Sequence, residues 1–121
     1  QPVWAHPARG FVMNSDVIAL GSIRVDRASA TVTVNGVAIH LTPKEALLLW
    51  TLMRQPNVIL SRAELMQQVW DTTFTGDTRT LEVHVNWLRK KIERDPRRPL
   101  YLRTVRRQGY VFVWPPSPTI P

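Results

Sequence analysis

Two short motifs mark the starts of helices, and they constrain the fold more than any other feature of the sequence. Residues 42–45, Thr-Pro-Lys-Glu, place a hydroxyl at a helix cap, proline at the first helical position and glutamate three residues after the cap. Ser61 and Glu64 repeat the hydroxyl–glutamate pair. Each pair is a capping box, because its side chains bond backbone N–H groups that the first turn leaves unpaired. The sequence therefore predicts a first helix from residue 43, nearly encircled by apolar residues and so buried, and a second from residue 62.

The residues before the first motif have β character. Val32 and Val34 alternate with threonines, which is a period of two. Asn35-Gly36 lies between two apolar runs, and this pair is a strong signal for a tight hairpin turn. Residues 17–41 therefore predict a small antiparallel sheet of three or four short strands.

The residues after the second helix predict a third helix and a hairpin. Asp77 or Thr78 caps a helix that runs to about Arg94, and a 3.6-residue period gives it a core stripe of Leu81, Val85, Leu88 and Ile92. Two β runs, 101–105 and 110–114, then flank a turn with two arginines and Gly109. The order sheet, helix, helix, loop, helix, hairpin predicts an α+β winged helix-turn-helix domain over residues 15–115. Residues 1–14 and 116–121 are expected to be linker and tail.

The third helix carries two apolar side chains outside its core stripe. Val83 and Trp87 lie one turn apart on the opposite side, among Arg79, Asn86 and Lys90. Three explanations are open. The face can read DNA bases, because the major groove accepts amide, guanidinium and apolar groups. It can be a protein interface, where tryptophan is enriched, or it can pack against another part of the domain such as the N-terminal segment.

The formal net charge of +7 is concentrated in one part of the chain. Residues 79–107 carry ten Lys/Arg and three Asp/Glu, whereas the other residues carry six of each sign. A localised basic block on folded elements is typical of a polyanion-binding site, although charged faces are also common on solvated helices. Because Arg103, Arg106 and Arg107 continue the block beyond the helix, the charge favours the base-reading explanation.

Other classes of protein fit the sequence poorly. The chain has no cysteine, and His6, His40 and His84 are scattered without metal-ligand spacing. We therefore expect no metal, no cofactor and no catalytic activity. The longest apolar run, residues 46–50, is far too short to span a bilayer, so we expect no membrane association and a cytoplasmic location. A first residue other than methionine indicates a fragment or a processed chain.

Five motifs follow one another along the chain: Leu41-Thr42-Pro43-x-Glu45, Ser61-Arg62-x-x-Leu65 with Val69-Trp70, Arg79-Thr80-Leu81-x-Val83-His84-Val85, Leu88-Arg89-Lys90-Lys91, and Thr104-Val105-Arg106-x-x-Gly109-Tyr110. With these motifs, residues 17–114 resemble the C-terminal effector domain of OmpR/PhoB-type response regulators. The resemblance implies a four-stranded N-terminal sheet, three helices and a hairpin wing. It also implies binding to double-stranded DNA as a dimer on tandem repeats, control of bacterial transcription, and a phosphorylated receiver domain that is absent from this chain and would be joined through residues 1–14.

The resemblance and the helix geometry together predict the site. The predicted DNA-binding residues are Trp70, Arg79, Thr80, Val83, His84, Asn86, Trp87, Arg89, Lys90, Thr104, Arg106 and Arg107. The loop where relatives contact RNA polymerase corresponds to Asp71, Thr72, Thr73, Phe74, Thr75 and Gly76. Two positions depart from the family pattern. Relatives usually carry a basic pair at the place of Asn86-Trp87 and often glycine at that of Arg107, so the base contact of an arginine near position 87 does not transfer.

Overall fold

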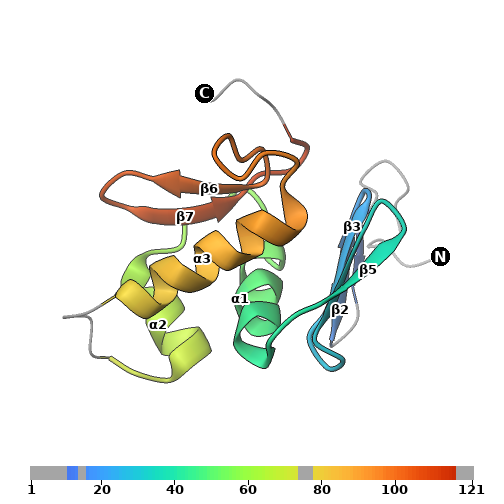
Figure 1. Ribbon diagram of the computed structural model, residues 1–121. Helices are drawn as coiled ribbons and strands as arrows, with labels where there is room; N and C mark the ends of the chain where they lie inside the picture. Colours follow the sequence, from blue (N-terminus) through green and yellow to red (C-terminus); the bar gives the residue numbers. More distant parts are fainter. Residues whose placement is uncertain (1–10, 14–15, 74–77, 117–121) are drawn as a thin grey trace.

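The computed structural model describes residues 11–13, 16–73 and 78–116 of the chain, with side chains from residue 16 onward. Figure 1 shows an N-terminal sheet, three helices and a C-terminal hairpin. The elements are β1 (Phe11–Met13), β2 (Val17–Leu20), β3 (Ile23–Asp26), β4 (Thr31–Val34), β5 (Val37–His40), α1 (Pro43–Met53), α2 (Arg62–Trp70), α3 (Arg79–Ile92), β6 (Leu102–Val105) and β7 (Gly109–Phe112). The predicted α+β winged helix-turn-helix is confirmed.

The N-terminal strands form one antiparallel sheet in the order β1-β2-β3-β4-β5. Residues 17–41 form four of these strands, as predicted, and the fifth, β1, lies in the segment predicted as linker and pairs with β2. A three-residue strand is too short to show a period of two, so only its pairing defines it. The buried face of the sheet, which includes Ile18, Ile23 and Val25, lies against α1.

Helix α1 is the centre of the domain. Both predicted capping boxes form: Thr42 and Glu45 bond each other's backbone amides at 3.2 and 2.7 Å, and Ser61 and Glu64 do so at 3.0 and 2.8 Å. Residues 48–53 are all buried. Because α1 contacts the sheet, α2, α3 and β7, every other layer of the molecule is positioned from it (Figure 1).

Helix α3 packs on α1 through the predicted stripe of Leu81, Val85, Leu88 and Ile92, all of which are buried. The helix ends at Ile92, two residues before the predicted end at Arg94, because Glu93 adopts an extended conformation with φ −90° and ψ 142°. The Glu93 carboxylate then accepts backbone N–H groups of residues 100, 101 and 102 at 2.7, 3.0 and 2.8 Å. At the other end Thr78 occupies the cap position without a side-chain cap bond, and Asp77 lies outside the described residues.

Strands β6 and β7 form the wing, an antiparallel pair with Val105 opposite Gly109. The segment between α1 and α2 joins this hairpin, because Leu60 and Tyr110 exchange backbone hydrogen bonds of 2.9 and 3.0 Å. The backbone N–H of Asn57 also bonds the wing, donating to the Phe112 carbonyl at 2.8 Å. The wing is thereby fixed to the helices rather than hinged on α3 alone.

Candidate nucleic-acid interface

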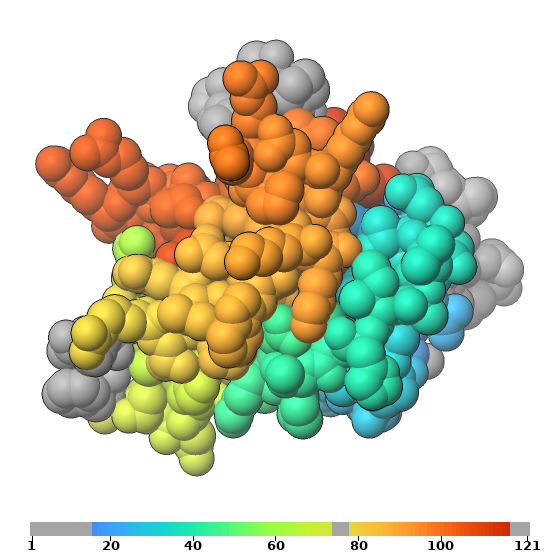
Figure 2. Space-filling model, in the orientation of Figure 1, coloured from blue at the N-terminus to red at the C-terminus, as the bar shows by residue number. Residues whose placement is uncertain are grey.

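The outer face of α3 presents apolar side chains to water, as the sequence predicts. Val83 and Trp87 are 41% and 43% exposed, although the helix buries four other apolar residues. The polar members of this face are exposed as well: Arg79, Thr80, Asn86 and Lys90. Figure 2 shows this part of the molecule at the front, with the wing projecting beside it. The face therefore combines apolar, amide and cationic groups on one rigid element.

Trp87 belongs to an aromatic cluster with His84 and Trp70. The His84 ring lies 4.9 Å from the Trp87 ring and 5.0 Å from the Trp70 ring, centroid to centroid, and meets Trp70 edge to face. The Nδ1 atom of His84 is 2.7 Å from the carbonyl oxygen of Thr80. Because a carbonyl only accepts, Nδ1 carries the proton in this contact, and Nε2 is the other polar atom of the ring. The cluster braces the Trp87 side chain from one side and joins the end of α2 to α3.

Arg89 connects α3 to the wing. Its Nε donates to the Leu102 carbonyl at 2.9 Å, and one terminal nitrogen donates to the Thr104 hydroxyl at 2.8 Å. Burial lowers the pKa of the Arg89 guanidinium, while the charges of Tyr110 and Glu93 oppose the change. A guanidinium stays protonated even so. Two residues predicted to contact DNA thus bond each other and connect α3 to the wing.

The three consecutive cations at residues 89–91 have three different environments. Lys91 donates to the buried Glu45 carboxylate at 2.8 Å, whereas Lys90 is exposed. Burial alone raises the pKa of Glu45, but the hydrogen bonds from Lys91 and Thr42 and the charge of Lys91 outweigh it and leave the pKa below its ordinary value. Lys91 therefore ties α3 to α1, and only Lys90 of the three is fully presented to solvent.

The wing tip carries two exposed arginines, as predicted. Arg106 and Arg107 follow the last residue of β6, and the N–H of Gln108 closes the turn on the Val105 carbonyl at 2.9 Å. Arg107 has a φ of 65°, the left-handed region that glycine enters most easily. The glycine expected here from the family resemblance would have a conformational reason, and this chain has an arginine instead.

The predicted polymerase loop begins at the end of α2. Trp70 is half-buried, and Asp71 ends the helix with a φ of 53°. The Thr72 amide donates to the Met66 carbonyl at 3.4 Å. Phe74, Thr75 and Gly76 lie outside the described residues, so the role of this loop stays a prediction.

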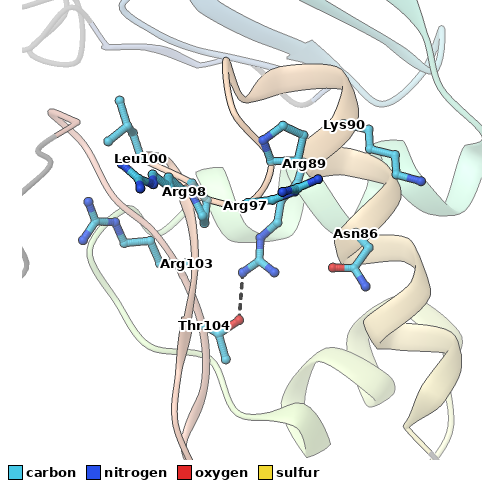
Figure 3. Close-up of a pocket in the computed structure, with 10 residues that line it drawn as sticks. Asn86, Arg89, Lys90, Arg97, Arg98, Leu100, Arg103 and Thr104 are labelled. Carbon is cyan, nitrogen blue, oxygen red and sulfur yellow. Dashed lines mark hydrogen bonds between the residues drawn. The ribbon is translucent and has the colours of Figure 1, made fainter.

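Sequence reasoning missed three arginines near α3. Arg97, Arg98 and Arg103 line a groove together with residues of α3 (Figure 3). They belong to the basic block of residues 79–107, but no periodicity links the irregular segment after α3 to a face of the helix. Only the return of the chain into β6 brings these residues beside Lys90.

Two further observations concern the described residues. Within residues 16–73 and 78–116, no three His, Asp or Glu side chains gather in a way that could hold a metal ion. None of the helices described is both long and apolar enough to cross a membrane.

Three helices with a hairpin after the third define a winged helix-turn-helix protein. The fold is similar to that of the Klebsiella pneumoniae RstA DNA-binding domain in complex with the RstA box, with a TM-score of 0.72, 29% identity, and coverage of 80% of this chain and 96% of that one. It is also similar to the response regulator DrrB of Thermotoga maritima, an OmpR/PhoB homolog, with a TM-score of 0.70, 30% identity, and coverage of 80% and 44%.

Residues 36–112 match the family described as "Transcriptional regulatory protein, C terminal", and the chain belongs to this family. It is 51% identical over 81 residues to a probable transcriptional regulatory protein of Picosynechococcus sp., covering 67% of this chain and 32% of the relative. It is 46% identical over 98 residues to the sensory transduction protein RegX3 of Mycobacterium tuberculosis, covering 81% of this chain and 43% of the relative. The chain thus spans less than half the length of these two relatives, and the predicted OmpR/PhoB-type identity is confirmed.

Proposed function

We propose that this domain binds double-stranded DNA sequence-specifically to regulate transcription, as the output domain of a two-component response regulator. The exposed face of α3 carries the proposal, because Val83, Asn86 and Trp87 stand there among cations, beside a wing tipped with two arginines. An α-helix fits the major groove, which is about 12 Å wide. A wing beside such a helix reaches the adjoining backbone or minor groove.

The proposed base readers are the three central residues of this face. Asn86 can pair bidentately with adenine, and the apolar surfaces of Val83 and Trp87 suit the methyl group of thymine. His84 holds the Trp87 ring from one side at a centroid distance of 4.9 Å. A braced indole loses little conformational freedom on binding, which supports a direct contact by Trp87.

The proposed backbone contacts surround the readers. Arg79, Thr80 and Lys90 flank them on α3, and Arg106 and Arg107 stand at the wing tip. Such contacts set register and affinity but carry no sequence information by themselves. The remaining predicted contacts are each bonded or packed within the domain: Trp70, His84, Arg89 and Thr104. In the proposal they hold α3 and the wing in position and also contact the DNA backbone.

The wider assembly belongs to the same proposal. Two such domains would bind tandem repeats as a dimer, residues 71–76 would contact RNA polymerase, and a receiver domain would precede the chain. The site of action would be the bacterial cytoplasm, and the domain would have no catalytic role. Of these parts, the curated relatives support only the further domain, because this chain covers 32% and 43% of their lengths.

The main test is the salt dependence of binding to a duplex selected from a random pool. If about six phosphates are contacted, the slope of log K against log salt should be about −5. The rival function is docking to a partner protein through the apolar side chains of Val83 and Trp87. Binding through such a face should be nearly independent of salt concentration. A flat curve would therefore reject the DNA-binding proposal.

Trp87→Ala tests the assignment of base reading. We expect the ratio of affinities for selected and random duplexes to fall by roughly tenfold, since one good base contact is worth about 1–3 kcal/mol. Val37→Ala is the matched control, because Val37 is 61% exposed on the N-terminal sheet. A large drop in the thermal midpoint of Trp87→Ala alone would favour the packing explanation instead.

A further inference from the structure

A basic groove lies between the C-terminal half of α3, the segment after it and strand β6 (Figure 3). Among its described lining residues are five basic side chains and no carboxylate. The cations are Arg89, Lys90, Arg97, Arg98 and Arg103. Like charges gather in one place at an electrostatic cost, so such a groove is suited to an anion that spans several of them.

The segment that carries Arg97 and Arg98 is held in place by two acidic residues. Asp95 accepts the amide of Arg97 on its carboxylate at 3.0 Å and the amide of Arg98 on its carbonyl at 2.9 Å. The Glu93 carboxylate fixes the end of the segment through three backbone amides. The carboxylates of Glu93 and Asp95 thereby accept hydrogen bonds from backbone N–H groups. Neither Arg97 nor Arg98 forms an ion pair with a described residue. The groove thus presents two exposed guanidinium groups on a pre-organised loop.

The groove is continuous with the proposed DNA-binding face. Asn86 and Lys90 belong to both, since they are exposed on α3 and also line the groove. The Arg89–Thr104 hydrogen bond, dashed in Figure 3, holds the opposite wall on β6 at a fixed distance. A DNA strand that left the outer face of α3 toward its C-terminal end would therefore meet the groove that Arg97 and Arg98 line.

We propose that this basic groove binds sugar-phosphate backbone beyond the recognition helix, so that the domain contacts a longer stretch of DNA than α3 and the wing alone would cover. The inference rests on the proposed function. DNA fits better than a second copy of this domain, because the chain outside residues 79–107 has six acidic and six basic residues and no acidic excess to offer.

The experiment measures salt slopes for Arg97→Ala, Arg98→Ala and the double variant on the selected duplex. Each lost phosphate contact should make the slope less negative by about 0.9, and the double variant by about twice that. Arg98→Lys should keep most of the slope, because it keeps the charge. Arg24→Ala is the control: Arg24 is exposed between the buried residues Ile23 and Val25, on the sheet face turned away from α1.

Shortening the duplex base pair by base pair from each end locates the contact. When the duplex is shortened at one particular end, the affinity of the wild-type domain should fall to that of the double variant. The affinity of the double variant should not change with the same truncation. Base preference should not change in any groove variant, because phosphate contacts are independent of sequence.

The outcomes separate the two proposals. A flat salt curve for the wild-type domain rejects the proposed function itself. A steep wild-type slope that Arg97→Ala and Arg98→Ala leave unchanged rejects only the groove. A loss seen on two tandem sites but not on a single site would assign the groove to the neighbouring copy, and would also overturn the inference. Because both arginines are exposed on a loop, unchanged thermal midpoints are expected and serve as the folding check.

Discussion

Two of the hairpin turns in the domain, one in the N-terminal sheet and one in the wing, place different residues in the same region of backbone conformation. Between β4 and β5, Asn35 and Gly36 have φ angles of 51° and 83°. These are the residues that a two-residue hairpin turn favours. In the wing, Arg107 has a φ of 65°. Residues other than Gly, Asn and Asp are disfavoured in this left-handed region by about 1–2 kcal/mol. The residues of the sheet turn therefore match the backbone conformation that the turn requires. The wing turn has a charged arginine in a conformation that is unfavourable for it.

The difference shows how a structural and a functional hairpin can be told apart. Both are antiparallel pairs, but of these two only the wing carries cations at its tip. A left-handed φ does not by itself mark function, since Ala30 in the β3–β4 turn has a φ of 53°, but an exposed cation in this conformation is a candidate for a contribution outside the fold. Under the proposed function, that contribution is contact with DNA.

The largest expected effect compares the glycines of the two hairpins. A Cβ at Gly109 would collide with the carbonyl oxygen of Leu60, and backbone cannot move aside as a side chain can, whereas a Cβ at Gly36 would meet nothing within 4 Å. We expect Gly109→Ala to lower the free energy of unfolding by about 2–4 kcal/mol and Gly36→Ala by about 1 kcal/mol. Urea denaturation measures both, and equal losses would show that the wing is not held by its contact with Leu60.

The next effect concerns affinity rather than stability. Arg106→Ala should weaken binding to selected and random duplexes alike by roughly tenfold, because a phosphate or minor-groove contact would be lost at the exposed tip. Its thermal midpoint should stay unchanged. Arg24→Ala on the N-terminal sheet is the control with the same loss of charge. Equal weakening by both variants would mean that only net charge matters, and that the wing has no particular place on DNA.

The smallest effect has opposite signs for folding and binding. Arg107→Gly relieves the left-handed arginine but adds unfolded-state freedom, so stability should rise by less than about 1 kcal/mol. DNA affinity should fall severalfold as one charge is removed. Asn35→Gly in the sheet turn should change neither quantity much, because asparagine already tolerates this conformation. If Arg107→Gly lowered stability, the supposed cost of the arginine would be disproved.

Much of the architecture follows from local signals that the structure reproduces. Thr42 and Ser61 cap helices, Asn35-Gly36 turns a hairpin, and the stripe of Leu81, Val85, Leu88 and Ile92 is buried. Each of these signals acts within a few residues of itself. The strand β1 and the end of α3 were not predicted correctly, because each depends on a backbone pairing that no periodicity or capping motif signals. Strand β1 is defined by its pairing with β2, and the Glu93 carboxylate binds three amides of the returning chain.

The candidate site divides in the same way. Helical periodicity alone placed Val83 and Trp87 on the outer face of α3, and both are exposed. It could not show that His84 packs between the two tryptophans, since Trp70 comes from another helix. Nor could it show which cations of the basic block are used within the domain.

The sequence by itself determined the order of elements, the buried stripe of α3 and the concentration of charge in residues 79–107, because periodicity, capping and net charge are properties of neighbouring residues. Tertiary structure alone decided how that charge is divided. Lys91 pairs with Glu45 and Arg89 bonds Thr104, while Arg97 and Arg98 remain exposed beside α3. The physical reason is that a cation's role depends on the groups it meets in space, and the chain brings those groups together only when α1, α3 and β6 pack.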